Sequence, residues 1–234
     1  MCGRYTLTIT LEELLMRYGI DETTIPYSPK YNIAPRQMVL AIVHDGSKNR
    51  MGELSWGLVP PWADDPKIGS GMINARAETA AAKPAFKDAL KRKRCLIPAD
   101  GFYEWQEIEQ NGKKRKQPMR VVAKDRSIFS LAGLYETWQS PGGDKLSSCT
   151  ILTTTPNELM KPIHDRMPVI VHERDEALWL DRSVQDPARL ERLLAPYPSH
   201  ELEAYPVEAA VGNVRNDDAS LIAPQAEDEQ LRLW

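Results

Sequence analysis

The sequence predicts an α+β fold: a single domain built on a strongly bent, mostly antiparallel β-sheet (a pseudo-barrel) with peripheral helices. The candidate strands are short and separated by turns, and helices interrupt them without the alternation typical of a parallel sheet. The 234 residues, 42% of them hydrophobic, can bury one large core. Because no repeat or long linker divides the chain, residues 1–222 are expected to form the domain and residues 223–234 a polar C-terminal tail.

Capping residues mark the expected helices. Thr10 to Glu13 form a capping box before a helix with one apolar face, and Gly19 ends this helix. Thr155-Pro156-Asn157-Glu158 is a second capping box, with Pro at the first helical position. The remaining helices are expected over residues 83–94, 173–181 and 187–195, the last capped by Asp186-Pro187.

Apolar runs between turn residues indicate the strands. A Pro-rich extended stretch precedes the first of them, and a loop with several Gly and Pro residues follows the second. Asn111-Gly112 is a hairpin-turn signal. The expected strands are residues 38–43, 51–56, 101–108, 118–123, 127–135 and 148–154, with the extended stretch at 25–35 and the loop at 58–71.

The charge is unevenly distributed along the chain. The net charge of −3 divides into +6 over residues 1–126 and −9 over residues 127–234. A basic face on an acidic protein can still bind a phosphate backbone. Two basic clusters stand out, Lys91 to Arg94 and Lys113 to Lys116; we interpret the second as a solvated loop tip because it follows the Asn111-Gly112 turn.

The cysteines and the apolar runs indicate a cytoplasmic protein. Three cysteines without a CxxC pair favour a reducing compartment over a disulfide framework or a zinc site. Cys95 and Cys149 lie in apolar runs and are expected to be buried structural thiols. No stretch approaches the length of a membrane span, and the N-terminus lacks the apolar core of a signal peptide, so no membrane association is expected.

The position of Cys2 gives this residue unusual chemistry. Removal of Met1, which is usual before a small residue, leaves Cys2 with a free α-amine beside its thiol. Because the reference pKa values are about 8 for the amine and about 8.5 for the thiol, both nucleophiles are partly deprotonated near neutral pH. Such a pair can convert an aldehyde into a Schiff base and then a thiazolidine, whereas it would attack an ester or amide as an N-terminal nucleophile. The alternative is an ordinary residue near a frayed terminus.

Three further polar residues are candidates for a reaction site. Glu104 lies between aromatic residues in a predicted strand, where burial would raise its pKa towards that of a general acid; the alternative is an edge carboxylate facing water. His164 has an acid and an Arg beside it at an irregular junction and is either a proton shuttle or a structural histidine. Asn74 follows a Gly-rich loop and can position a substrate hydroxyl or the Cys2 terminus, or is an ordinary turn residue.

Seven motifs in order resemble the SRAP family, the SOS-response-associated peptidase-like proteins that process abasic sites. The resemblance runs from Cys2 to about Asn216 and leaves only the tail outside it. The motifs are MCGRY at the start, YNIAP at 31–35, WGLVPPW at 56–62, INARAET at 73–79, IPADGFYEW at 97–105, HDRMP at 164–168 and VGNVRN at 211–216.

The resemblance implies that the chain senses abasic sites in single-stranded DNA and cross-links to them covalently through Cys2, as a thiazolidine, after loss of Met1. Glu104 would then protonate the sugar ring oxygen, His164 would shuttle protons and Asn74 would orient the amine and the substrate. Family members are also described as relieving their own cross-link. A DNA-repair role in the SOS response, lyase-type chemistry and autoproteolytic removal of Met1 follow as expectations.

The resemblance also implies a DNA-binding surface. Arginine side chains would position phosphates and Trp62 would offer a stacking surface beside the lesion, so binding is expected to be independent of base sequence and to weaken with salt. A monomer associated with the nucleoid or the replication fork is expected, with no cofactor and no metal. The positions that match the family's DNA-contacting residues are Arg4, Pro35, Trp62, Arg76, Thr153 and Arg166.

Two other classes of function remain open at the level of sequence. A Cys2-dependent peptidase or hydrolase, assisted by His164 and by Glu104 or Asn74, has the right residue types. A non-covalent reader of damaged or modified DNA would leave Cys2 with a structural role only. Replacement of Cys2 by Ser distinguishes the hypotheses, because only the cross-linking hypothesis predicts a covalent DNA adduct that this replacement abolishes.

Overall fold

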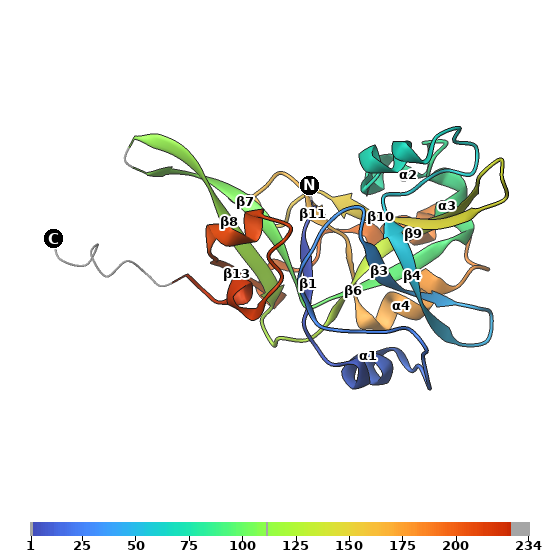
Figure 1. Ribbon diagram of the computed structural model, residues 1–234, viewed down its shortest axis with the longest axis horizontal. Coiled ribbons are helices and arrows are strands. Elements are labelled where there is room, and N and C mark those ends of the chain that lie inside the picture. The colour runs from blue at the N-terminus through green and yellow to red at the C-terminus, as the bar shows by residue number, and fades with distance from the viewer. Residues whose placement is uncertain (1, 111, 226–234) are drawn as a thin grey trace.

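The computed structural model describes residues 2–110 and 112–225, which form two β-sheets with short helices around them (Figure 1). The strands are β1 (Tyr5–Leu7), β2 (Lys30–Ile33), β3 (Met38–His44), β4 (Asn49–Trp56), β5 (Asn74–Arg76), β6 (Arg94–Ala99), β7 (Gly101–Gln110), β8 (Lys113–Ala123), β9 (Phe129–Gln139), β10 (Lys145–Thr154), β11 (Met167–Pro168), β12 (Ile170–Val171) and β13 (Leu202–Pro206). The α-helices are α1 (Leu11–Tyr18), α2 (Ala77–Ala80), α3 (Lys87–Arg92), α4 (Glu173–Leu180) and α5 (Pro187–Glu191), and the 3-10 helices are η1 (Pro66–Gly71), η2 (Arg192–Leu194), η3 (Ser199–Glu201), η4 (Ala209–Gly212) and η5 (Ala219–Ile222).

The strand order confirms the predicted fold class of a mixed, mostly antiparallel β-protein with peripheral helices. One sheet has the order β13-β8-β7-β1-β2, and the other has the order β11-β10-β4-β3-β6-β9-β12 with β5 beside β10. Among the described strands, only the pairings of β10 with β4 and with β5 are parallel. The first sheet therefore places the N-terminal strand β1 between β2 and the long hairpin of β7 and β8.

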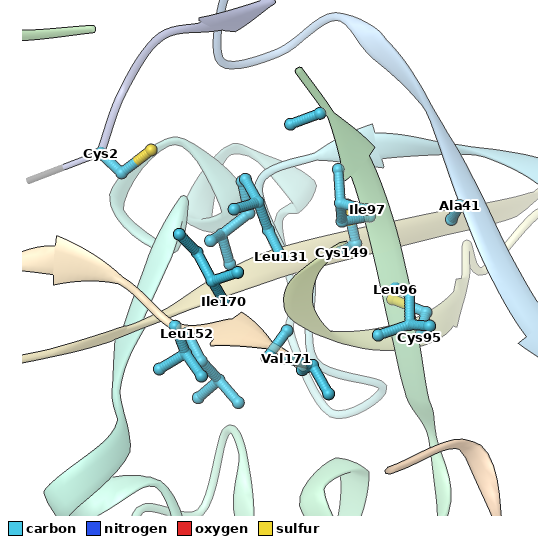
Figure 2. Close-up of a cluster of buried hydrophobic side chains, with 14 of the residues drawn as sticks. Cys2, Ala41, Cys95, Leu96, Ile97, Leu131, Cys149, Leu152, Ile170 and Val171 are labelled. Carbon is cyan, nitrogen blue, oxygen red and sulfur yellow. The ribbon is translucent and has the colours of Figure 1, made fainter. Parts of the chain in front are cut away.

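The main hydrophobic core is made by side chains from the second sheet together with β1. Cys95 and Cys149 are fully buried in it as free thiols, as their apolar surroundings predicted. Cys2 is also fully buried and lies at one end of this cluster (Figure 2). The second residue of the chain is thus part of the packed interior.

The capping residues identify the starts of α1 and α5 correctly, and α4 forms where a helix was predicted although its N-cap, His172, makes no side-chain capping hydrogen bond. Thr10 Oγ1 accepts a hydrogen bond from Glu13 N at 3.2 Å, and Gly19 ends the helix in the left-handed region with φ 60°. The helix predicted over 173–181 is α4, whereas that predicted over 187–195 is shorter, since α5 passes into the 3-10 helix η2. Within residues 2–110 and 112–225, no helix combines the length and the apolar character needed to cross a membrane.

The helix predicted over residues 83–94 is wrong at both ends. The helix covers only Lys87–Arg92, and Arg94 begins β6, a buried central strand between β3 and β9. The predicted helix ended with the four basic residues Lys91 to Arg94, a composition typical of the exposed end of a helix. Arg94 is instead only 3% exposed, so the last residue of the basic run belongs to the interior.

The second capping box does not begin a helix. Thr155 to Asn157 are extended, and the following residues form consecutive turns. Asn157, rather than Thr155, caps these turns, because its Oδ1 accepts a hydrogen bond from Met160 N at 2.9 Å. The turns end at His164, whose backbone N–H donates to Met160 O.

The basic cluster Lys113 to Lys116 lies in a strand and not in a loop tip. Gln110 pairs with Lys113 across the turn, so the predicted hairpin is present and the cluster belongs to the ladder of β7 and β8. The four side chains are nevertheless exposed, as the solvated interpretation required.

The first residues of the predicted C-terminal tail contact the end of β13. Pro224 pairs with Val207, and Gln225 N donates to Pro206 O at 2.8 Å, so these residues are attached to the end of β13. The rest of the predicted tail, residues 226–234, lies outside the described residues.

Arg94 joins the C-terminal ends of two helices. Its Nε donates to Trp179 O at 2.5 Å, and its Nη1 donates to Leu90 O and Lys91 O, both at 2.7 Å. Its Nη2 donates to Asp181 O. These carbonyls lie at the C-terminal ends of α3 and α4, and Asp181 O also accepts a hydrogen bond from Val184 N.

We expect Arg94→Met to lower the free energy of unfolding by about 3 kcal/mol, because it leaves several buried carbonyls without donors. Arg92→Met, at an exposed position of the same basic run, should change it by less than about 0.5 kcal/mol. Urea denaturation of both variants measures the difference. Equal, small effects would contradict the role assigned to Arg94.

Candidate functional site

Cys2 is positioned by the ladder between β1 and β7. Tyr5 pairs with Phe102, and Tyr103 N donates to Arg4 O at 2.9 Å, which continues the antiparallel register by one residue. The chain before Arg4 therefore runs alongside Glu104. Burial raises the pKa of the Cys2 thiol well above its usual value, and the negative charge of Glu104 raises it further. The buried sulfur is thus a neutral thiol that needs a proton acceptor when it attacks.

Glu104 is a buried carboxyl group in the middle of β7. It is 2% exposed, and burial raises its pKa from the usual 4.5 to about 7. This is the direction that its aromatic neighbours in the sequence predicted. Near neutral pH the group is present in both protonation states, so it can donate a proton in one step and accept one in another.

His164 faces Glu104 from the loop before β11. Its Nε2 lies 3.9 Å from Glu104 Oε2, and its Nδ1 accepts a hydrogen bond from Arg166 N at 3.0 Å, which leaves the proton of the neutral ring on Nε2. Asp165 Oδ1, 2.8 Å from Nδ1, favours the protonated ring, but this carboxylate is 86% exposed and its charge is screened by water. Burial has the larger effect and lowers the pKa of His164.

The usual order of the two pKa values is consequently reversed. Glu104 retains a proton up to about pH 7, whereas His164 loses its proton below its ordinary value of 6.5. The carboxyl group is therefore the acid of this pair and the imidazole is its neutral neighbour. Environments that separate two titrating groups in this way assign their acid and base roles.

Asn74 contacts the Cys2 residue directly. It lies in β5, which is held parallel to β10 by the pairing of Asn74 with Ile151. Its Nδ2 donates to Cys2 O at 2.9 Å. Its buried Oδ1 accepts no hydrogen bond from the described part of the chain. A buried acceptor of this kind, next to Cys2, suits an amine or hydroxyl donor.

The structure thus brings together the four predicted reaction residues from four separate segments. The set supplies a thiol, a carboxyl group that titrates near neutral pH, a neutral imidazole and an amide. This combination can perform nucleophilic addition with proton transfer. In residues 2–110 and 112–225, no three His, Cys, Asp or Glu side chains gather closely enough to bind a metal ion.

Two of the predicted DNA-contacting arginines are held by the protein itself. Arg4 Nη1 donates to Asn32 Oδ1 at 2.9 Å and to Val211 O at 2.7 Å. Arg166 forms two hydrogen bonds to Glu78, at 2.7 and 2.9 Å, and a third to Thr153 O at 2.6 Å. Both guanidinium groups are therefore fixed in position, and Arg166 would have to exchange Glu78 for a phosphate.

The other predicted DNA contacts differ in exposure. Arg76 is exposed, and its side chain makes no hydrogen bond or ion pair within the described residues. Trp62 is 56% exposed, Pro35 is partly buried and Thr153 is 1% exposed. Arg76 and Trp62 can contact a ligand directly, whereas Thr153 acts in this conformation as an acceptor for Arg166.

Two residues of the site were missed in the sequence. Glu78 follows Arg76 by two positions, but only the fold brings it to Arg166, 88 residues away. Tyr5 packs edge-to-face against Trp56, and its buried hydroxyl makes no hydrogen bond in the described part of the chain. Burial raises the pKa of this hydroxyl, and the nearby thiols of Cys149 and Cys2 add to the shift. Its place within MCGRY was the only signal in the sequence.

The fold and the buried thiol–carboxyl pair define a mixed β-protein with a candidate acid–base site beside its second residue. The chain belongs to the SOS response associated peptidase (SRAP) family, whose family model matches residues 1–214.

Relatives cover almost the whole chain. It is 49% identical over 225 residues to the abasic site processing protein YoqW of Bacillus subtilis, covering 95% of this chain and 99% of that protein. It is 32% identical over 230 residues to the abasic site processing protein YedK of Escherichia coli, covering 96% and 100%. A crystal structure of a protein from Bacteroides thetaiotaomicron has the same fold, with a TM-score of 0.85 at 25% identity over 96% of this chain and 100% of that one.

Proposed function

We propose that the protein processes abasic sites in single-stranded DNA and forms a covalent thiazolidine cross-link with them through Cys2. The proposal rests on one observation above all: a buried carboxyl group with a pKa near 7 lies beside a buried thiol at the start of the chain. Relatives that share up to 49% of the sequence are named as abasic site processing proteins.

The first step opens the sugar ring. Glu104 donates its proton to the ring oxygen as the bond from that oxygen to C1 breaks, and the resulting carboxylate takes up the proton of the C1 hydroxyl. The product is an aldehyde at C1 and a free hydroxyl on the former ring oxygen. The protonated Nε2 of His164 faces this carboxylate and stabilises it while it is charged, and the pair ends the step as it began.

The second step forms the cross-link. The α-amine of Cys2, free after loss of Met1, adds to the aldehyde carbon, and a proton from Glu104 assists the departure of water. The sulfur then adds to the carbon of the protonated Schiff base, whose nitrogen becomes the neutral N–H of the thiazolidine. Glu104, now a carboxylate, can accept the thiol proton that burial holds on the sulfur. The overall change is the loss of one water, and reversal of the same steps would release the DNA.

The same residues suit the removal of Met1. Attack of the Cys2 thiol on the preceding peptide carbonyl needs a base for the thiol and an acid for the departing amine, and water then hydrolyses the thioester and releases Met1. Glu104 can fill both roles because it titrates near neutral pH. We therefore include autoproteolytic exposure of Cys2 in the proposal, in keeping with the peptidase description of the family.

DNA would lie across the surface that carries Arg4, Arg76 and Arg166, with Trp62 stacking beside the lesion. Arg76 and Trp62 are exposed, and Arg166 has a 12% exposed side chain that contacts Glu78 at the surface. Contacts of this type bind the backbone and not the bases. The protein would act as a monomer at the nucleoid or replication fork.

Intact-mass measurement tests the proposal directly. The purified protein should lack Met1, and an oligonucleotide with one abasic site should convert it to a species whose mass is the sum of the two minus one water. A matched oligonucleotide with a tetrahydrofuran residue at the same position has no aldehyde and should give no adduct. An unchanged mass with the true abasic site would refute the cross-linking function.

A further inference from the structure

The β7–β8 hairpin extends well beyond the reaction site. Glu104 lies near the middle of β7, and six further residues carry the strand outward to Gln110 (Figure 1). At about 3.4 Å per residue, this outer part is about 20 Å long. We call it the arm; it consists of residues 106–110 and 112–117. Its end projects away from both sheets in Figure 1, and its β8 strand carries the basic cluster described above.

The strand register divides the charges of the arm between its two faces. Residues that are paired across an antiparallel ladder point to the same face, and faces alternate along each strand. Ile108 pairs with Arg115 and Gln110 pairs with Lys113 on the face that carries Glu104. We call this the inner face. Between Glu104 and the turn, its described residues include two cations and no carboxylate; they are Gln106, Ile108, Gln110, Lys113, Arg115 and Gln117.

The outer face of the arm is nearly neutral by comparison. Glu107 pairs with Lys116, and Glu109 pairs with Lys114. Lys114 Nζ also lies 2.6 Å from Glu107 Oε1, across the diagonal. Two acids thus balance two lysines on this face. The positive charge of the arm as a whole therefore comes from Lys113 and Arg115 of the inner face.

The inner-face cations are available to a ligand. Arg115 donates to the neutral amide oxygen of Gln110 at 2.7 Å, and neither Arg115 nor Lys113 forms an ion pair with any described residue. Both side chains are exposed. They stand about 13 and about 20 Å from Glu104 along the strand, so they form a row that starts at the reaction site.

We propose that the inner face of the arm binds the phosphate backbone of single-stranded DNA on one side of the reaction site. This inference rests on the proposed function, since the lesion bound at the reaction site fixes the position of the DNA strand on the protein. Two cations in a row, without carboxylates between them, fit a repeating phosphate chain. The arm would thereby extend the DNA-binding surface beyond the arginines next to Cys2 and would contact one flank of the lesion only.

A pair of charge-matched variants tests the proposal. The inner-face variant is Lys113→Gln with Arg115→Gln. The control is Lys114→Gln with Lys124→Gln, which removes the same charge from the outer face of the arm and from the far end of the same hairpin; both positions are exposed. All four positions tolerate a polar side chain, so both proteins should fold. The probes are single-stranded oligonucleotides with a tetrahydrofuran lesion and about ten nucleotides on either its 5′ or its 3′ side only.

The dissociation constant is measured against salt concentration for each protein and probe. The logarithm of the association constant falls linearly with the logarithm of the salt concentration. For the inner-face variant this fall should become less steep, its slope smaller in magnitude by about 1.4, with one of the two probes and stay unchanged with the other. The control should leave both slopes unchanged. Unchanged slopes for the inner-face variant, or equal losses with both probes, would overturn the proposal.

A second measurement separates this inference from the proposed function. With saturating DNA that contains a true abasic site, the inner-face variant should still form the full covalent adduct, because its reaction residues are intact. If the unmodified protein forms no adduct, the proposed function fails. If it forms the adduct and the slopes do not differ, only the role of the arm fails.

Discussion

Replacement of Cys2 by Ser is expected to eliminate the stable adduct with abasic DNA. The Cys2→Ser variant, prepared without Met1, keeps the amine, so a Schiff base can still form, but a hydroxyl is a far poorer nucleophile at neutral pH than a thiol and no thiazolidine can close. We expect a reduction in adduct of at least about 10³-fold after a fixed incubation, measured by intact mass. Binding to undamaged single-stranded DNA should be unchanged, because Cys2 is buried and offers no surface to the backbone.

Borohydride distinguishes the two bonds that Cys2 is proposed to make. Because it reduces a Schiff base to a stable amine, the Cys2→Ser variant should be trapped on abasic DNA when borohydride is present and released when it is absent. Cys149→Ser, which alters another fully buried thiol, is the control and should retain the adduct. Stable adduct in the Cys2→Ser variant without borohydride would contradict the thiazolidine.

Glu104→Gln should slow formation of the cross-link by about 10²- to 10⁴-fold, the usual contribution of a positioned acid–base group. The amide has nearly the same shape and no charge, so it preserves packing in the buried site but cannot donate and recover a proton. Single-turnover rates measured by gel shift report the difference. Glu107→Gln, at an exposed position on the other face of β7, is the matched control and should react at the normal rate.

The pH dependence gives an independent test of Glu104. Reaction needs the protonated carboxyl group, whose population falls as pH rises through about 7, and the neutral amine, whose population rises through about 8. The normal protein should therefore show a bell-shaped rate with its maximum between these values. In the Glu104→Gln variant the fall at high pH should disappear, leaving only the rise. If the rate of this variant still falls at high pH, the fall belongs to a group other than Glu104.

The sequence was most informative where a local pattern determines the local structure. Capping residues located the starts of α1 and α5, and apolar runs located the long strands. The prediction failed at Arg94 because the cost of burying an arginine depends on the carbonyls that surround it, and those belong to α3 and α4. It failed at Thr155 because Asn157 satisfies the backbone of the following turn just as well.

The sequence singled out the candidate site residues one by one, but it did not show the geometry in which they meet. Cys2 and Glu104 stand out by position and by neighbours in the chain. Nothing local indicates that the Nδ2 of Asn74 donates to the backbone of Cys2, or that Arg166 contacts Glu78. These contacts join segments that are 72 and 88 residues apart, and only the pairing of β5 and β11 with β10 brings them together.

The hydrogen bonds of Arg4 to the far end of the chain have a consequence for the biosynthesis of the protein. Arg4 donates to Val211 O across 207 residues, and η4 must therefore have left the ribosome before the N-terminal segment can be secured. Until then Arg4, two residues after Cys2, lacks these partners, although it is among the first residues to be made. The N-terminal segment is thus secured late in synthesis, when the chain that surrounds it is already present.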